Sequence, residues 1–353
     1  LKAFAQARAQ APLRSQMAAA TSDAELRRDA HRLARLAQDA CAGDDSLEVS
    51  GIVWLEHINI VTGNRSQAEI FYFQGLGLTR DPVRDFGGTM WANIGPRQQF
   101  HLVDASDKDG GAQAVDGCVG LALPDLPALL KRLSTVSKAL EGTRFSFADL
   151  GSCVAVSCPW GNRFFVYPTA PVSGASEPPA KKPRTRMEEA HATVDRGMAV
   201  RGEAGIRFLQ WRCADAGRAA RLYEKTLGCR VRLGAEGSDA LVCVGPSVHL
   251  VFTTVPSPRD PEQLRLASGV HVCVYVCEFK RMYDALKEKG LIWTNPRFAH
   301  LDTCDTYEEA VASRQFRFRS LRDDSGEELA ELEHEVRSLR HVQFMKQVYY
   351  VAR

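Results

Sequence analysis

Histidines at repeated positions are the residues in this chain whose type and spacing could do chemistry. The chain has nine histidines, and His101 and His249 stand at the same place in two similar segments, QQFHLV and PSVHLV. His271 begins an alternating apolar run, and His57 lies on the polar face of another. Imidazole is the commonest metal ligand in proteins. The positions therefore predict either a divalent-metal site or a set of buried, hydrogen-bonded rings.

Other polar side chains share the strands on which these histidines lie. Cys273 and Tyr275 alternate with apolar residues after His271, so all three face the same side of a strand. The hydroxyl of Tyr275 could donate a proton to a bound substrate, or it could line a cleft without chemistry. In FRFRSLR, Arg317 and Arg319 alternate with phenylalanine, which indicates either a site for an anionic substrate or a solvated strand face.

The elements that must position these residues occur in repeated order. The segments LEHINIVTGNRSQAEIFYFQGLGL (55–78) and IRFLQWRCADAGRAARLYEKTLGC (206–229) each contain an apolar strand, a polar turn and a helix that ends at Leu-Gly. GCVGLALPDLPALL (117–130) and GVHVCVYVCEFKRM (269–282) form a second related pair. Repeats of this kind set the architecture. The pattern predicts a βαβββ unit four times over.

The predicted organisation has four parts. They are an N-terminal helical extension (1–50), a first pair of units (51–169), a Pro-rich charged linker (170–203) and a second pair (204–353) that carries a lid-like insertion (295–314). In the extension, Ser22 and Glu25 form a capping-box pattern that begins an amphipathic helix. An insertion of this length is typical of a lid or of a partner surface.

Composition and charge exclude several classes of protein. The 353 residues are 45% hydrophobic with a net charge of +2, so a nucleic-acid-binding surface is not expected. No apolar run reaches the roughly 18 residues that a membrane span needs. The ten cysteines form no CxxC pair, which favours reduced thiols in a soluble protein of a reducing, intracellular compartment. Residues 1–22 contain no acid, which is typical of a chloroplast or mitochondrial transit-peptide remnant or of an Ala-rich helical tail.

Four βαβββ units in two pairs resemble the vicinal oxygen chelate superfamily, which includes glyoxalase I, bleomycin-resistance proteins and extradiol dioxygenases. The LEHINI strand, the FYFQGLGL and LYEKTLG helix ends, the HLV strands and HVCVYVCEF carry the resemblance over 51–168 and 205–336. It implies an α+β fold in which the four modules pair into two glyoxalase-like open-barrel domains. It also implies a divalent metal that keeps open positions for vicinal oxygens of a substrate.

The resemblance also implies which residues would hold the metal. Carried over by position, the candidates are His57, His101, Val119 and Phe165 in the first pair of units, and Phe208, His249, His271 and Glu331 (or Glu333) in the second. The valine and the two phenylalanines depart from the family's histidine or glutamate. The implied site is therefore His249, His271 and Glu331 with Fe, Mn or Zn, with Tyr275 as the catalytic candidate. His57 and His101 form a weaker set without a carboxylate.

Two functions follow from this resemblance. One is a metalloenzyme, a dioxygenase or a lyase or isomerase, that acts on a small oxygenated substrate in the second domain. The alternative is a non-catalytic binding or assembly subunit of a larger protein complex that has lost a complete metal site. The partners are then a small-molecule substrate or a protein complex. Whether the barrels form within each half of the chain or by exchange between the chains of a homodimer is open at this level.

Overall fold

The computed structural model describes residues 22–40, 50–82, 88–105, 111–169, 203–234, 237–256, 260–346 and 348–351. The transit-peptide and linker predictions, for 1–22 and 170–203, concern residues that lie outside this description apart from Ser22 and Glu203. In the described part of the chain no helix is long and apolar enough to cross a membrane.

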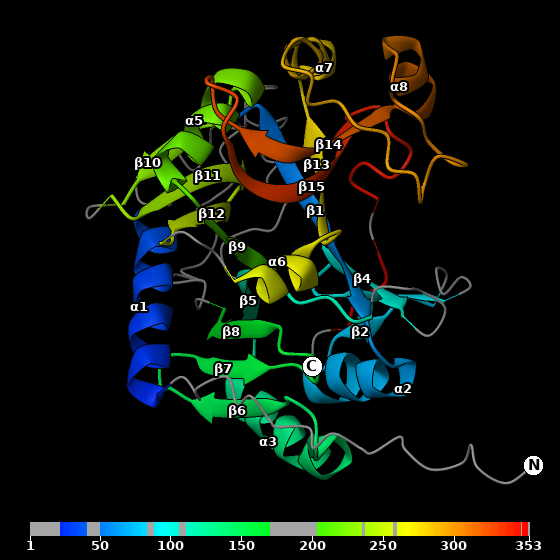
Figure 1. Ribbon diagram of the computed structural model, residues 1–353. Coiled ribbons are helices and arrows are strands. Elements are labelled where there is room, and N and C mark those ends of the chain that lie inside the picture. Colours follow the sequence, from blue (N-terminus) through cyan, green and yellow to red (C-terminus); the bar gives the residue numbers. More distant parts are fainter. Residues whose placement is uncertain are drawn as a thin grey trace, which may run out of the picture.

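The first and fourth βαβββ units form one seven-stranded mixed sheet (Figure 1). Its strands are β1 (Ile52–Thr62), β2 (Thr79–Arg80), β3 (Thr89–Asn93), β4 (Gln99–Asp104), β13 (His271–Val276), β14 (Gln315–Arg322) and β15 (Glu328–Ser338). Their order across the sheet is β14-β15-β13-β1-β4-β3-β2. At the centre, β1 pairs antiparallel with β13, so the two units meet along their first strands.

The second and third units form the other, eight-stranded sheet. Its strands are β5 (Gly117–Leu123), β6 (Ser146–Asp149), β7 (Val154–Ser157), β8 (Arg163–Pro168), β9 (Gly205–Cys213), β10 (Val231–Leu233), β11 (Asp239–Gly245) and β12 (Val248–Thr254). Their order is β10-β11-β12-β9-β5-β8-β7-β6. Here β5 pairs antiparallel with β9, again joining two units along their first strands.

Helices follow the first strand of each unit, as the repeats predict. They are α2 (Arg65–Ala68), which continues as a π-helix (Glu69–Gly75), α3 (Leu126–Val136), which continues as a 3-10 turn (Ser137–Leu140), α5 (Ala216–Leu227) and α7 (Phe279–Glu288). Asn64, Asp125 and Asp215 cap three of them by accepting a backbone N–H. The helices α6 (Pro261–Ala267) and α8 (Tyr307–Ser313) were not predicted, and α8 lies inside the insertion.

The predicted fold class is confirmed, since four related units build an α+β fold with two mixed sheets, neither of which closes. In the fourth unit one of the strands is reduced to an isolated bridge between Ile292 and Phe318. The pairing of the units does not follow the two halves of the chain. Each sheet takes one unit from 51–169 and one from 204–353. The strand in the middle of each sheet is therefore hydrogen-bonded to a strand that is distant in sequence.

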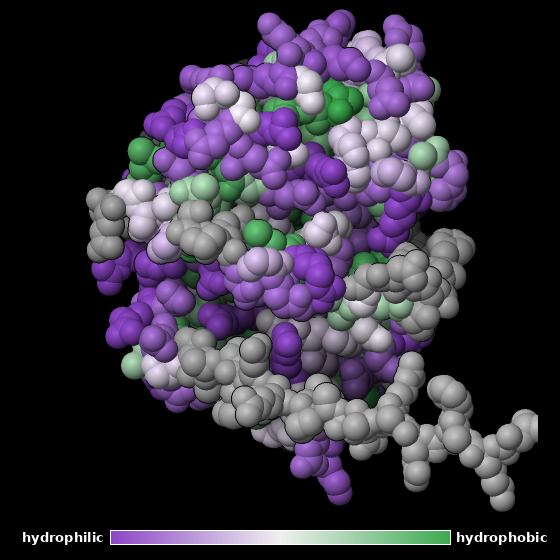
Figure 2. All heavy atoms as spheres, in the orientation of Figure 1, coloured by the Kyte–Doolittle hydropathy of each residue, from purple (hydrophilic) through white to green (hydrophobic). Residues whose placement is uncertain are grey.

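The N-terminal helix α1 (Asp23–Ala40) covers one face of the eight-stranded sheet (Figure 1). Its predicted capping box is present, because Glu25 N donates to Ser22 Oγ over 3.3 Å and Ser22 N donates to a Glu25 carboxylate oxygen over 2.8 Å. Ala30 and Leu33 are buried against strands β5 to β12. Where α1 and its neighbours meet solvent, the face seen in Figure 2 is largely hydrophilic. The helix is thus amphipathic in the sense that its sequence predicts.

Candidate metal centre

Three of the predicted histidines lie together in the seven-stranded sheet. His57 on β1 has β4 on one side, with His101, and β13 on the other, with His271. The ring centroids of His57 and His101 are 3.6 Å apart, and those of His57 and His271 are 5.7 Å apart. His249 lies on β12, in the other sheet. His57 and His101 therefore come from the first unit and His271 comes from the fourth, so both halves of the chain contribute to this group.

The carboxylate that reaches these histidines is Glu335. The parallel pairing of β13 with β15 sets His271 opposite Glu333 and Cys273 opposite Glu335. Oε2 of Glu335 lies 3.6 Å from Nε2 of His271. Glu331 shares this strand face but lies four residues before Glu335, where it accepts a hydrogen bond from Ser268 Oγ over 3.2 Å and lines a cavity of about 510 Å³.

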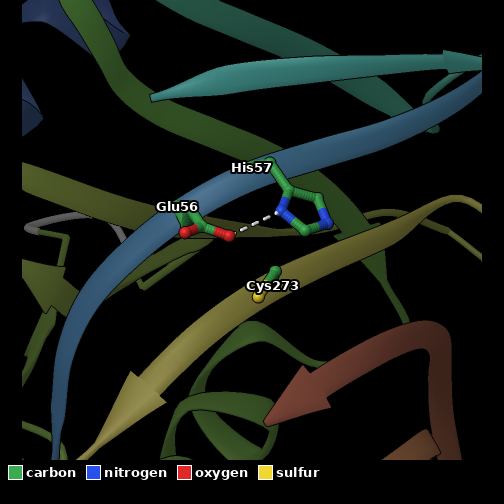
Figure 3. Close-up of side chains that lie close together, drawn as sticks. All are labelled: Glu56, His57 and Cys273. Atoms are coloured by element: carbon green, nitrogen blue, oxygen red, sulfur yellow. Dashed lines mark hydrogen bonds and ion pairs between the residues drawn. The ribbon is translucent and has the colours of Figure 1, made fainter. Parts of the chain in front are cut away.

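Two groups of potential ligands occur in the part of the chain that the structure describes. His57, His271 and Glu335 place ligand atoms within 4.8 Å of one another, and so do Glu56, His57 and Cys273 (Figure 3). All are buried except Glu56, which is partly exposed. His249 and Glu331 are in neither group.

The hydrogen bond of His57 fixes which of its ring nitrogens is free. Nδ1 lies 3.1 Å from Oε2 of Glu56 (Figure 3). Burial opposes ionisation of Glu56, but the hydrogen bond with His57 and the charge of Arg337 outweigh it and hold the pKa of Glu56 below its ordinary value. An ionised carboxylate only accepts, so Nδ1 carries the hydrogen, and in the neutral ring it is Nε2 that has the free lone pair. Nε2 is buried and has no partner, which costs about 1–3 kcal/mol unless a ligand satisfies it.

Burial and charge place the remaining donors in their metal-binding forms. Burial lowers the pKa of His271 well below its ordinary value, and the Arg317 guanidinium adds to this. Burial likewise lowers the pKa of His101. Burial acts to raise the pKa of Glu335, but the charges of Arg337 and Arg317 prevail and hold it well below its ordinary value. At neutral pH the rings of His101 and His271 are neutral and the carboxylate of Glu335 is charged, as metal coordination requires.

Two arginines, the buried Arg317 and the partly buried Arg337, bind the carboxylates of this site. Arg317 donates to Glu333 over 3.0 Å, to Glu335 over 2.9 Å and to Asp302 over 3.2 Å. Arg337 contacts Oε1 of Glu335 at 2.5 Å. Arg317 is 4% exposed, so the solvated-face interpretation of its strand is wrong for this residue. The reason is tertiary, because the insertion packs over it.

The insertion 295–314 packs over His271 and Arg317. Asn295 donates to both oxygens of Glu333, over 2.9 and 3.0 Å. The ring of Phe298 lies edge-on to His271, with centroids 5.9 Å apart, and its face meets the Arg317 guanidinium at 4.6 Å. The lid-like role that the sequence predicts for this segment stays a prediction.

His101 and Tyr275 support His57 from two sides. His101 is stacked between His57 and Trp91, with ring centroids 3.6 and 3.9 Å away. The hydroxyl of Tyr275 donates to Oε1 of Glu56 over 2.9 Å. Burial raises the pKa of Tyr275, so the phenol stays protonated. Its proton is directed at Glu56, and any role in proton transfer to a substrate stays a prediction.

On the corresponding face of the eight-stranded sheet, two of the predicted ligand positions are buried phenylalanines. Phe165 and Phe208 pack there with Leu33 of α1 in one buried cluster. Val119 is also fully buried. His249 has an unpartnered Nδ1, but the described residues provide no group of three ligand atoms around it. This face holds a helix where the other sheet holds polar side chains.

The strand pattern of the sequence does not mark Glu56 as a site residue, because a β-bulge re-aims its side chain. Leu55 lies opposite Val274 and His57 opposite Cys273, so Glu56 is an extra residue in β1. Strict alternation places the side chain of Glu56 on the face opposite to His57, whereas a bulge turns it. Glu335 was missed through register, although the alternation from Glu331 onward marks the correct face.

The fold is similar to those of glyoxalase I and of extradiol dioxygenases. Glyoxalase I from Zea mays is 12% identical, with a TM-score of 0.47 and coverage of 81% of this chain and 92% of that one. Homoprotocatechuate 2,3-dioxygenase from Arthrobacter globiformis is 16% identical, with a TM-score of 0.28 and coverage of 86% and 83%. The 2,3-dioxygenase LapB from Pseudomonas sp. KL28 is 12% identical, with a TM-score of 0.28 and coverage of 86% and 95%. No family model and no curated protein matches the chain.

Proposed function

We propose that the protein is a metalloenzyme of the vicinal oxygen chelate type, in which His57, His271 and Glu335 bind one divalent ion. The observation that carries this proposal is the buried, unpartnered Nε2 of His57, beside two further ligand groups within 4.8 Å. Two histidines and one carboxylate suit Fe, Mn and Zn. Compared with the site that the sequence implies, the proposed site keeps His271. It has His57 in place of His249 and Glu335 in place of Glu331.

The charges around the site leave room for a cation. The carboxylates are Glu56, Asp302, Glu333 and Glu335, and the guanidinium groups are Arg297, Arg317 and Arg337. Four potential negative charges therefore face three positive ones. Glu335 accepts from one arginine at each oxygen. A carboxylate has about four lone-pair positions, so it retains capacity for a metal bond.

The chain's own residues would prepare the site for a small oxygenated substrate. Glu56 orients His57, and the stacked rings of His101 and Trp91 limit its rotation. Phe298 and the rest of the insertion keep water from His271. A bound ion would supply Lewis-acid polarisation of substrate oxygens, which serves both dioxygenation and a lyase or isomerase reaction.

Metal content tests this proposal. The protein is purified without oxygen and its metals are measured by elemental mass spectrometry, beside His57→Ala, His271→Ala and His249→Ala. We expect about one equivalent of Fe, Mn or Zn in the wild type, its loss in the first two variants, and its retention in His249→Ala. His249 is a matched control because it is another buried histidine with an unpartnered ring nitrogen. Loss of the metal in His249→Ala alone would contradict the proposed site and would indicate a metal site in the eight-stranded sheet, around His249.

The non-catalytic alternative is favoured by one observation. Both oxygens of Glu335 are already paired with Arg317 and Arg337, so the cluster's charges are partly satisfied by the chain itself. In that case the buried network is a structural element of a binding or assembly subunit. Absence of metal from all four proteins, even after reconstitution with each ion, would reject the metalloenzyme and leave this alternative.

A further inference from the structure

Glu56 owes its place beside His57 to the β-bulge in β1. At the bulge, two residues of β1 span one residue of β13, between the Leu55–Val274 and His57–Cys273 pairs. Bulges of this kind are frequent next to functional sites, where they re-aim a side chain. Figure 3 shows the Glu56 carboxylate directed at the His57 ring and close to the sulfur of Cys273.

Each oxygen of Glu56 has its own hydrogen-bond donors. Oε1 accepts from Tyr275 over 2.9 Å, and Oε2 accepts from Arg337 over 2.8 Å and lies 3.1 Å from Nδ1 of His57. Tyr275 and Arg337 are also linked, since Nη1 of Arg337 lies 3.3 Å from the tyrosine hydroxyl. The carboxylate is therefore fixed from two strands, β13 and β15, while it holds a ring on β1.

We propose that Glu56 is a positioning residue that presents Nε2 of His57 to the metal, and that the bulge exists to deliver it. This inference rests on the proposed metal centre. A carboxylate on the far nitrogen of a ligand histidine fixes its tautomer and ring orientation and makes the near nitrogen a stronger donor. In this arrangement Glu56 holds the far nitrogen of His57 rather than the metal, because its Oε2 lies on Nδ1 and not on the Nε2 side of the ring.

The test is the Zn²⁺ affinity of metal-free protein, measured by competition with a chelating dye. Glu56→Gln keeps the size of the side chain but removes its charge, and we expect it to bind Zn²⁺ about 10–100-fold more weakly. Glu331→Gln is the matched control, because it makes the same change on a strand of the same sheet outside the ligand groups, and its affinity should equal that of the wild type. The visible spectrum of the Co²⁺ form should change in Glu56→Gln and not in Glu331→Gln.

The outcomes separate this inference from the proposed function. If the wild type binds no Zn²⁺, the metal centre itself is rejected. If the wild type binds and Glu56→Gln binds as tightly with an unchanged Co²⁺ spectrum, the positioning role is rejected while the metal centre stands. Equal weakening in Glu331→Gln would also reject it, because the effect would be one of general charge. If Glu56→Gln does not fold, Glu56→Asp decides, since it keeps the charge for Arg337 but withdraws the carboxylate from His57.

Discussion

At the scale of the residue, two histidines with similar sequence surroundings have opposite environments. His101 and His249 both precede Leu-Val on a fourth strand. His101 lies opposite Asn59 and stacks on His57, whereas His249 lies opposite Phe208. In the repeated segments 55–78 and 206–229, Asn59 corresponds to Gln210, which is two residues beyond Phe208. The pairing of β4 with β1 therefore differs by two residues from the pairing of β12 with β9. Burial and the charge of Arg230 lower the pKa of His249 to about 4.

This depressed pKa predicts a pH-dependent stability. The unfolded chain takes up a proton on His249 near pH 6.5, but the folded protein does so only near pH 4. The contribution of the neutral His249 ring to the free energy of unfolding is fully present above pH 6.5. It is lost as the pH falls from 6.5 to about 4, by about 1.4 kcal/mol per pH unit. Urea unfolding of the wild type and His249→Gln between pH 7.5 and 4 measures this. The unfolding free energy of the variant should fall less steeply, and parallel curves would contradict the prediction.

At the scale of the element, α1 and the insertion occupy the same kind of position on the two sheets. The insertion brings polar side chains, Asn295 and Asp302, onto the buried arginine and glutamates. The helix α1 brings Ala30 and Leu33 onto phenylalanines. One face is thereby covered by a polar loop, and the other by a helix that packs on phenylalanines. Among the described residues only the first face carries a group of three potential ligands, so a metal site is expected there.

Leu33→Ala tests the role of α1. Leu33 is fully buried, so its truncation should lower the unfolding free energy by about 2–5 kcal/mol. Arg35→Ala on the exposed side of the same helix should change it by less than about 0.5 kcal/mol. Denaturant unfolding gives both values. Because α1 covers the other sheet, both variants should keep the metal content of the wild type, and a loss of metal in Leu33→Ala would link the two faces.

At the scale of the whole molecule, the two halves of the chain are interlocked through both sheets. β1 is hydrogen-bonded to β13, and β5 is hydrogen-bonded to β9. The central pair of strands in each sheet therefore has one strand from each half of the chain. His57 and His271 come together only through the first of these pairs. The proposed metal centre thus requires both halves.

Separation of the halves provides the corresponding prediction. After cleavage at a protease site introduced in the predicted linker, 170–203, the fragments should stay together, because backbone hydrogen bonds across both sheets join them. Residues 51–169 and 204–353, each expressed alone, should lack a cooperative unfolding transition and should regain one on co-expression. Gel filtration and circular dichroism measure this. Independent cooperative folding of either half would contradict it.

The sequence determined the repeated units and the tertiary structure decided how they pair. Hydrophobic periodicity, capping residues and Leu-Gly helix ends are local signals, so they predict the four βαβββ units, the α1 capping box and the polar faces of β1 and β13. Strand pairing between distant segments leaves no local signal. The sequence therefore marked His57, His101 and His271 as candidate ligands. It grouped His271 in one metal site with His249 and Glu331, and not with His57. The β1–β13 pairing, the bulge at Glu56 and the register of Glu335 arise only when the chain is folded.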